Sequence, residues 1–478
     1  MKTRSATGRG SASHAASRSD ILRLERRVHP HVRESVTAGL LWPNTYDSGM
    51  SSLGFLWALR SLSVPGVMGC ERYFAVPAPE TTGASPEPCS LDSGFPVGSC
   101  DLVACSISHE PDVLNVLRTF AAAGLPLKAA DRGPDAPFTL AGGPLTRSNP
   151  EPLTPFFDAV VTGDGERAMS LLRDAVSAGA RTRGQLGEAL IGLPELAGVP
   201  YHAPASSLPV VSTISTPEAA LGDMTLVEVS RGCPKSCTFC IGARANGPLR
   251  LADIGTIPGR LPADTRGLGI IGAAVSYHPG LEDLLEHAAS RGIRAGISSL
   301  RADRIDRNVA RLLAATGAEV LTVAADGPSQ AARDRIRKDV DEEQLVAAAS
   351  LVREAGLHAM KVYVMVGLPD ESDADIEELA ATANRLHRIL PAVLSLSVFV
   401  PKRNTPLATA PFGPVDAVTR RLALLRKRLS GGVRTNAVSA KEALVEYLVS
   451  HATAADADRL VRLSSTLGRY QDWVREFA

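Results

Sequence analysis

Three of the seven cysteines in this 478-residue chain stand within eight residues of one another. Cys233, Cys237 and Cys240 are separated by three and then by two residues. Three thiolates on one short loop suit a four-iron, four-sulfur cluster in which three irons bind cysteine and the fourth iron stays open. A closed zinc site requires a fourth ligand, and no histidine or further cysteine lies nearby in the sequence. Three cysteines this close together also disfavour disulfides, so the spacing predicts an open cluster.

The cysteine loop follows the alternating, β-branched run from Met224 to Ser230, which predicts a strand. The cysteine spacing, with Phe239 directly before the last cysteine, resembles the signature of the radical S-adenosylmethionine (SAM) superfamily. In that family the open iron binds the amino and carboxylate groups of SAM, and an electron passed to the sulfonium releases a 5′-deoxyadenosyl radical. The resemblance implies a 4Fe-4S cluster on the three cysteines, SAM as a second cofactor, and an external electron donor such as flavodoxin or ferredoxin.

Strands and helices alternate along residues 224–410. After the first strand, apolar and β-branched runs predict five more strands, at 268–271, 293–298, 320–324, 360–366 and 394–400. Helical periodicity predicts helices between them, at 279–291, 304–315, 342–354 and 373–390. Six parallel strands would make a partial (β/α)6 radical SAM barrel, open on one side, in which the chemistry gathers at the carboxyl ends of the strands.

The carboxyl ends of these strands resemble the SAM-binding stretches of the superfamily. The resemblance assigns SAM contacts to Gly272, Ala273, Ala274, Ser299, Arg301, Asp326, Gly367 and Pro369. The chain departs from the family pattern at two places, since no glutamate stands in the turn near Ala274 and Ala325-Asp326 replaces the usual Pro-Glu. Arginine suits a carboxylate because its planar fork pairs with both oxygens. An ordinary turn at 272–274 and a surface arginine at 301 are the alternatives.

Residues 36–200 also alternate between strands and helices, which predicts an α/β domain with a doubly wound, Rossmann-like parallel sheet. Its strands are expected at 37–42, 101–107, 138–141 and 158–162, with a ligand beyond their carboxyl ends. No Gly-x-Gly-x-x-Gly follows the first strand, so the loops are not a nicotinamide fingerprint. Together with the barrel that follows, these loops resemble the cobalamin-binding domain of one large branch of radical SAM enzymes.

In that branch such loops surround the corrin ring and its nucleotide tail. The resemblance implies cobalamin contacts at Asn44, Tyr46, Gly49, Ser106, Ser108, Gly142, Gly143, Pro144, Gly163 and Gly165. The Asp-x-His-x-x-Gly motif that places a histidine below cobalt in mutase-like domains is absent, so we expect no protein histidine on that face. A plain doubly wound domain, which also has glycines in its turns, is the alternative.

The composition of the chain indicates which classes of binding partner and which cellular compartment to expect. The formal net charge is zero, so we expect no nucleic-acid partner. No apolar run approaches the ~18 residues of a transmembrane helix, and we expect no membrane partner. The N-terminus lacks a hydrophobic signal region, and an iron–sulfur loop with unpaired thiols suits a reducing cytoplasm. The remaining segments are predicted to be a disordered extension (1–35), a linker (201–223) and a short helical C-terminal region (411–478).

If both cofactors bind, radical methylation of an unactivated carbon, with methylcobalamin as the methyl donor, is the economical reaction. Relatives of this branch also perform ring contractions, cyclisations and couplings, so the substrate, a small molecule or a peptide, and the catalytic residues stay open. One alternative is a sulfur-inserting, methylthiotransferase-like enzyme with an auxiliary cluster on Cys70, Cys89, Cys100 and Cys105. The other alternative is a non-catalytic binding protein derived from this fold.

Overall fold

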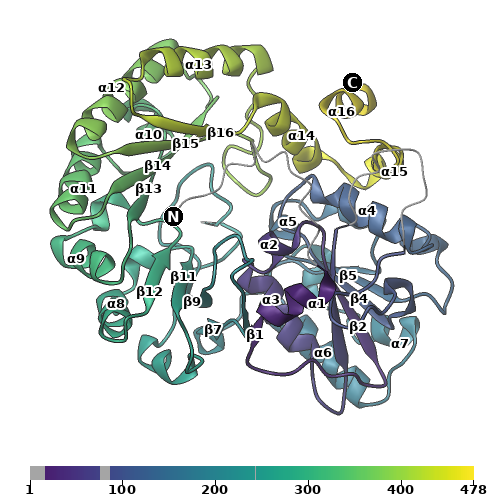
Figure 1. Cartoon of the computed structure of the whole chain (residues 1–478). Coiled ribbons are helices and arrows are strands. Elements are labelled where there is room, and N and C mark those ends of the chain that lie inside the picture. Colours follow the sequence, from purple (N-terminus) through teal and green to yellow (C-terminus); the bar gives the residue numbers. More distant parts are fainter. Residues whose placement is uncertain (1–16, 76–86, 243, 478) are drawn as a thin grey trace. The chain divides into compact units, whose positions relative to one another are not determined.

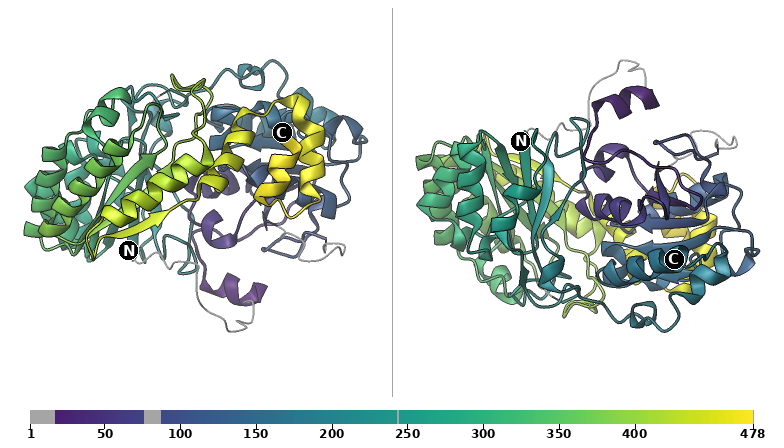
Figure 2. Two further views of the ribbon diagram at one scale, coloured as in Figure 1. Left: turned by 90° about the horizontal axis from the view of Figure 1, so that it is seen from above. Right: turned by 90° about the horizontal axis from the view of Figure 1, so that it is seen from below.

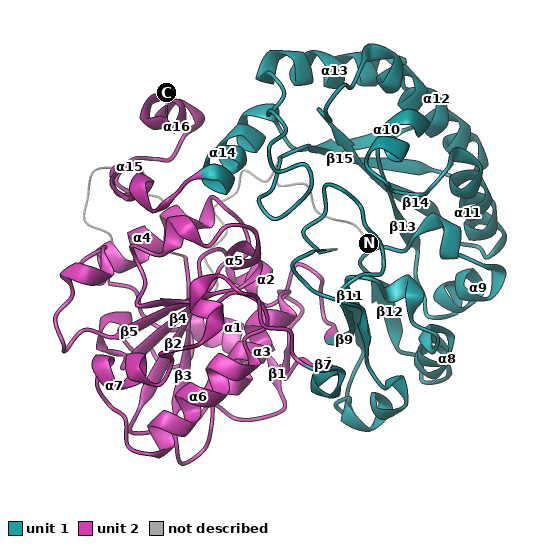
Figure 3. Cartoon of the chain, turned by 180° about the vertical axis from the view of Figure 1, so that it is seen from behind, with its two compact units in different colours: residues 1, 204–209, 226–451 teal, residues 2–203, 210–225, 452–478 magenta. Residues whose placement is uncertain are grey.

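The computed structural model describes residues 17–75, 87–242 and 244–477. The described chain divides into two compact units, which Figure 3 colours separately. Within the described residues, the barrel unit contains residues 204–209 and 226–451, and the sheet unit contains residues 17–203, 210–225 and 452–477. The sheet unit is therefore discontinuous in sequence, because most of the barrel unit is inserted into it.

A five-stranded parallel sheet forms the centre of the sheet unit (Figure 1), in the order β3-β2-β4-β5-β6. The strands are β2 (Thr37–Trp42), β3 (Gly69–Phe74), β4 (Leu102–Ser106), β5 (Phe138–Gly142) and β6 (Ala159–Val160). Helix α3 (Leu53–Leu62) connects β2 to β3, which lies on one side of β2 in the sheet, and α4 (Asp112–Ala122) connects β4 to β5, which lies in the opposite direction along the sheet. Because such crossovers are right-handed, the two helices lie on opposite faces of the sheet. The predicted doubly wound sheet is confirmed, and its switch point lies between β2 and β4.

The strands of the barrel unit follow one another in space in sequence order. They are β9 (Thr225–Arg231), β11 (Gly267–Gly272), β12 (Arg294–Ile297), β13 (Val320–Asp326), β14 (Ala359–Val366), β15 (Ala392–Val398) and β16 (Arg434–Ala437). A parallel bridge between Leu300 and Val323 joins the two halves of this array. The predicted partial barrel is confirmed, and β16 is an additional strand, parallel to β15, that the sequence patterns did not indicate.

Helices cover one face of the barrel strands (Figure 2): α8 (Leu281–Ser290), α9 (Arg307–Ala315), α11 (Glu342–Glu354), α12 (Asp373–Ile389) and α13 (Val415–Arg428). Side chains cap the first turns of three of them, because Asp306, Asp341 and Ser372 each accept a backbone N–H there. Every second residue of β14 is buried, and the intervening Lys361 and Tyr363 are half-buried on the opposite face. Among the helices of the described chain, none is long and apolar enough to cross a bilayer.

Part of the N-terminal extension is ordered. Residues 18–24 form α1 (Arg18–Leu24), and β1 (Arg26–Arg27) pairs antiparallel with β8 (Ile214–Ser215). Arg26 also makes an ion pair with Asp223 at 2.5 Å. The expectation of disorder over 1–35 is therefore wrong for residues 17–35, and residues 1–16 lie outside the described chain.

The C-terminal region is helical, as expected, and is shared between the units. Helix α14 (Ala440–His451) belongs to the barrel unit, whereas α15 (Ala457–Ser464) and α16 (Tyr470–Phe477) belong to the sheet unit. Arg118 of α4 donates hydrogen bonds to the carbonyl oxygens of Ser464 (3.1 Å) and Thr466 (2.9 Å). Residues 452–477 thus complete the unit to which the described N-terminal residues belong.

Candidate functional site

The cysteine loop begins where β9 ends, and Gly232 sets its direction. Gly232 has φ +73°, in the left-handed region that favours glycine. A Cβ atom there would stand 2.2 Å from the carbonyl oxygen of Pro248 and 2.6 Å from that of Gly247. No other residue fits without a backbone shift, so this glycine directs the chain from the strand into the loop that carries the three cysteines.

The middle of the loop is fixed to other strand ends of the barrel. The backbone N–H of Thr238 donates to the carbonyl oxygen of Ile336 at 3.0 Å. Phe239 packs against a buried apolar cluster that includes Ile336, Leu368 and Phe399. Leu368 follows β14 and Phe399 follows β15, so the aromatic residue of the motif anchors the loop to the carboxyl ends of two strands.

The three thiols differ in exposure but influence one another. Cys237 is buried, and Cys233 and Cys240 are half-buried. Burial raises the pKa of the Cys237 thiol, the positive charge of Lys338 opposes that rise, and Cys240, Asp326 and Cys233 add to it. Cys237 therefore lies within electrostatic range of the other two cysteines and of the buried Lys338.

The donor set fits a 4Fe-4S cluster, because three soft thiolates stand on one anchored loop. In the described parts of the chain, no group of three or more His, Cys, Asp and Glu side chains is arranged to hold a single metal ion. A four-iron cluster binds each cysteine at a different iron, and it does not need three sulfur atoms around one metal. The cluster on Cys233, Cys237 and Cys240 stays a prediction.

Arg301, predicted to face the SAM carboxylate, is engaged with its own chain. Its Nε donates to Asp303 at 2.8 Å, and its two terminal nitrogens donate to the carbonyl oxygens of Lys338 (3.0 Å) and Asp339 (2.8 Å). The backbone N–H of Arg301 donates to Ser276 Oγ at 3.0 Å. The guanidinium thus connects the end of β12 to the segment that follows α10 (Gln330–Arg335).

Asp326 is the last residue of β13 and adopts φ +61°, a conformation that aspartate tolerates better than most residues. Its carboxylate accepts a hydrogen bond from Lys338 Nζ at 2.5 Å, and this lysine is only 7% exposed. No sequence motif singled out Lys338, because its partners come from other strand ends. The structure therefore brings Arg301, Asp326 and Lys338 together beside Cys237.

The remaining SAM candidates form the ends of β11, β12 and β14. A Cβ atom at Gly272 would stand 2.3 Å from Ser230 Oγ, so the ends of β9 and β11 approach closely. Next to it, Ala273 is exposed and Ala274 is buried, and Ser299 after β12 is half-buried. None of these observations tests SAM contact, which stays a prediction for each residue.

After β14, Gly367 has φ +91°, and its backbone N–H donates to both carboxylate oxygens of Glu371 at 2.9 Å. Burial raises the pKa of Glu371, although these backbone bonds and Arg421 oppose the rise. Pro369 is half-buried in the same turn. Glu371 was missed in the sequence because a buried carboxylate that holds a turn leaves no motif.

In the sheet unit, the glycines of the cobalamin-like loops differ in their surroundings. Gly143 has φ +104°, and a Cβ atom there would stand 2.6 Å from the carbonyl oxygen of Ile107. Gly163 has φ +89°, and its Cβ would stand 2.3 Å from the carbonyl oxygen of Tyr201. At Gly142, by contrast, an added Cβ would meet no atom of the described chain within 4 Å. The fold itself requires the first two glycines, and only Gly142 faces open space among these three.

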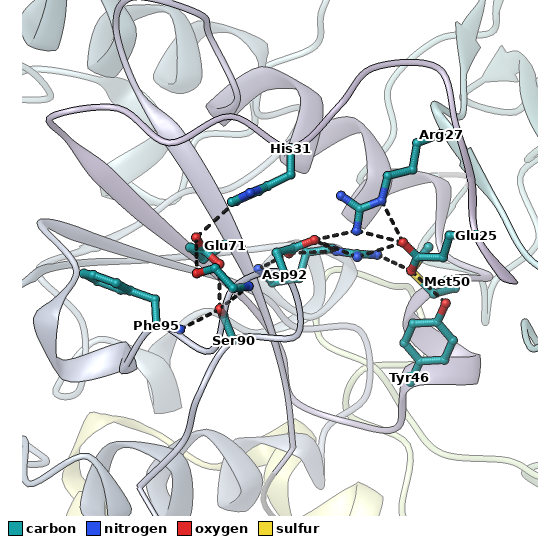
Figure 4. A network of polar contacts seen from close by, with 11 residues as sticks. Glu25, Arg27, His31, Tyr46, Met50, Glu71, Ser90, Asp92 and Phe95 are labelled. Carbon is teal, nitrogen blue, oxygen red and sulfur yellow. Dashed lines mark hydrogen bonds and ion pairs between the residues drawn. The ribbon is translucent and has the colours of Figure 1, made fainter. Parts of the chain in front are cut away.

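In the loop after β2, the predicted cobalamin contacts Asn44 and Tyr46 already bind other side chains of the protein. The Tyr46 hydroxyl donates to Glu25 at 2.8 Å (Figure 4), and its ring packs edge-on against Phe74. Asn44 Nδ2 donates to Asp112 Oδ1 at 2.9 Å, and burial raises the pKa of Asp112 to about 6. Aromatic rings also close the space around two more loop glycines, Gly49 (Trp42 and Phe74) and Gly165 (Trp57).

Some of the residues predicted to contact cobalamin are accessible at this edge of the sheet, and others are not. The ends of β4 and β5 offer accessible groups, since Ser106, Ser108 and Gly142 are half-buried and Pro144 is exposed. The Tyr46 hydroxyl is already bound to Glu25. The accessible residues among the predicted contacts therefore lie at the ends of β4 and β5, beside the switch point where an open α/β sheet binds its ligand.

A buried charge network, which no sequence motif indicated, connects the N-terminal segment to β3 (Figure 4). Arg72 is fully buried and pairs with Glu25 at 2.7 Å and with Asp92 at 2.8 Å. Arg27 pairs with Asp92 at 2.5 Å. Burial opposes ionisation of Asp92, but Arg72 and Arg27 outweigh it and hold the pKa of this carboxyl well below its usual range. The network has a structural role, because it ties residues 25–27 to the sheet.

Two known proteins are similar to this chain in sequence. The chain is 24% identical over 379 residues to an uncharacterized protein of Methanocaldococcus jannaschii, which covers 78% of this chain and 79% of that protein. It is 25% identical over 316 residues to an uncharacterized methyltransferase of Pyrococcus horikoshii, 60% of this chain and 67% of that protein.

Two solved structures are also similar. The cobalamin-dependent SAM radical enzyme OxsB, with aqua-cobalamin and SAM bound, matches with a TM-score of 0.46 and 14% identity, over 84% of this chain and 57% of that chain. Methylornithine synthase matches with a TM-score of 0.34 and 14% identity, over 48% of this chain and 69% of that chain.

Two family models match separate parts of the sequence. The model described as "Radical SAM proteins, N-terminal" matches residues 61–200, within the sheet unit. The model of the radical SAM superfamily matches residues 227–383, which include the cysteine loop and the strands up to β14. The barrel and its cysteine loop thus form a domain of the radical SAM superfamily.

Proposed function

We propose that the chain is a cobalamin-dependent radical C-methyltransferase. The observation that carries the proposal is the loop of Cys233, Cys237 and Cys240, anchored against the carboxyl ends of the barrel strands and preceded in the chain by a doubly wound sheet with an accessible edge. When bound, the cluster supplies the electron that splits SAM, and methylcobalamin supplies the methyl group. Overall, two SAM molecules and two electrons from an external donor convert R–H to R–CH3, with methionine, 5′-deoxyadenosine and S-adenosylhomocysteine as products.

The chain's own residues hold and shield these groups. The three cysteines are the ligands proposed for the cluster, and Phe239 fixes their loop by packing among buried side chains. The name of the Pyrococcus horikoshii relative supports methyl transfer as the reaction. The absence of the histidine motif from the sequence supports a cobalamin without a protein histidine on its lower face.

The sulfur-inserting alternative has weaker support. Cys70 and Cys105 lie buried within strands of the sheet, and burial raises the pKa of both thiols. Burial likewise raises the pKa of Cys100 to about 12, and this thiol is 3.3 Å from the Tyr73 hydroxyl. Buried, protonated thiols of this kind behave as small core residues. We therefore propose a single cluster.

The test is anaerobic reconstitution of the full chain with iron and sulfide. We expect close to four irons per chain and release of 5′-deoxyadenosine from SAM under reducing conditions. A variant with all three loop cysteines replaced by alanine should lose both, and iron retained in it would overturn the cluster assignment. Close to eight irons would favour sulfur insertion instead.

Purification from cells supplied with cobalamin tests the second cofactor. We expect near-stoichiometric cobalt and a visible spectrum without a lower nitrogen ligand. If no cobalt is retained and hydroxocobalamin does not bind at high micromolar concentration, methyl transfer through cobalamin is excluded, and a radical SAM enzyme of another reaction type is left.

A further inference from the structure

Lys338 is a buried cation beside the cysteine loop. Lysine is seldom buried unless it is paired, and here the residue is 7% exposed and its side chain donates to Asp326 at 2.5 Å. The lysine stands two residues after Ile336, whose carbonyl oxygen accepts the backbone N–H of Thr238 at 3.0 Å. Thr238 directly follows Cys237, so the turn that carries Lys338 is joined to the cysteine loop.

The turn that carries Lys338 is held in an unusual conformation. Arg337 and Asp339, on either side, adopt φ +52° and +50°, in the left-handed region that is strained for residues with a side chain. Arg301 donates to the carbonyl oxygens of both Lys338 and Asp339, and the backbone N–H of Lys338 donates to the carbonyl of Arg333 at 2.9 Å. These bonds offset the strain and fix where the lysine stands.

The same turn contacts the cysteine loop at two points. Ile336 accepts the backbone hydrogen bond of Thr238, and Asp339 pairs with Lys235 at 3.0 Å. The Thr238 hydroxyl is buried and has no hydrogen-bond partner among the described residues. A buried hydroxyl without a partner is costly, and a water or a bound group at this position would supply one.

We infer that Lys338 tunes the cluster of the cysteine loop and that Arg301 is the positioning residue that holds Lys338 there. A 4Fe-4S cluster with three thiolate ligands is anionic, and reduction adds one more negative charge. A fixed cation nearby stabilises the reduced state more than the oxidised state and raises the midpoint potential. The inference rests on the cluster in the proposed function and is independent of cobalamin.

The experiment measures the midpoint potential of the reconstituted full chain by EPR-monitored redox titration without SAM. Lys338→Met should lower the midpoint potential, whereas Lys338→Arg should leave it near the wild-type value. Asp326→Asn should raise the midpoint potential, because the substitution removes the negative charge that opposes Lys338. Arg301→Gln should lower the potential and speed the release of iron to a chelator several-fold. Lys427→Met on α13, where the lysine is exposed, is the matched control and should change nothing.

The outcomes separate this inference from the proposed function. Lys338→Met with full iron content and an unchanged potential overturns the inference alone. Loss of iron in Lys338→Met but not in Lys338→Arg supports the inference, because arginine keeps the positive charge and methionine does not. Loss of iron in both variants overturns the inference. A wild-type chain that binds no iron overturns the proposed function, and the inference fails with it.

Discussion

Gly143 lies so close to Ile107 that the carbonyl oxygen of Ile107 occupies the space of any Cβ atom at position 143, at 2.6 Å. The preceding glycine, Gly142, has open space at the same position. Two adjacent glycines at the end of β5 therefore serve different purposes. The first keeps the edge of the sheet open, and the second lets the chain turn tightly against β4.

Substitutions at Gly142 and Gly143 test these two roles in the sheet unit. Gly143→Ala should lower the free energy of unfolding by about 1–3 kcal/mol, because alanine is strained at φ +104° and meets backbone. Gly142→Ala should change it by less than about 1 kcal/mol. Urea unfolding followed by circular dichroism measures both. Gly142→Leu should weaken hydroxocobalamin binding in a protein that still folds, and undiminished binding would place the ligand elsewhere.

Phe239→Ala tests the anchor of the cysteine loop. The loss of a partly buried ring should lower the free energy of unfolding by about 2 kcal/mol and reduce iron content on reconstitution, because the loop loses its apolar contact with Ile336 and Phe399. Phe412→Ala, also partly buried in the barrel unit, is the control and should keep full iron content. Equal iron content in both variants would contradict the anchoring role.

Arg72→Met tests the buried charge network. It leaves Glu25 and Asp92 buried with less compensation and should destabilise the fold by about 3–5 kcal/mol, whereas Arg60→Met on the exposed face of α3 should have little effect. In the wild type the folded pKa of Asp92 lies below its unfolded value of about 3.9. Its stabilisation is therefore present above about pH 4 and is lost as the pH falls through the folded pKa. Unfolding midpoints measured from pH 7 down to about pH 2 would show this loss of stability in acid.

Asp112→Asn tests the opposite pH dependence. Burial raises the folded pKa of Asp112 to about 6, above the unfolded value of about 3.9. The neutral acid therefore stabilises the fold at low pH, and this contribution is lost as the pH rises from about 4 to 6. Asparagine keeps the acceptor for Asn44 and needs no ionisation. The variant should be about 1–3 kcal/mol more stable than the wild type at pH 7.5 and similar to it at pH 4, and equal stability at both would contradict the raised pKa.

The helices and strands that could be predicted well are those specified by residues close together in the sequence. The strand expected at 37–42 coincides with β2, and the helix expected at 342–354 coincides with α11, which a capping box starts at Asp341. Strand β3 was missed because Glu71 and Arg72 interrupt its apolar pattern, and their partners come from residues far away in the sequence.

In the candidate site, too, the features that depend on neighbouring residues could be predicted, and those that depend on residues far apart in the sequence could not. The cysteine spacing is contained in eight residues and was readable directly. Lys338 was not, because its relation to Cys237 depends on a turn held by Arg301 from another strand. Tyr46 stands in a loop whose sequence resembles a cofactor contact, but its hydroxyl binds a residue of the N-terminal segment that carried no sequence signal.

The division of the sheet unit between the two ends of the chain governs the order in which the protein can be assembled. During synthesis, residues 226–451 emerge before residues 452–477, so the barrel unit can close while the sheet unit still lacks α15 and α16. A fragment that stops before residue 452 leaves Arg118 without the carbonyl oxygens of Ser464 and Thr466. To produce the sheet unit alone, residues 452–477 must be joined to residue 225 by a designed linker.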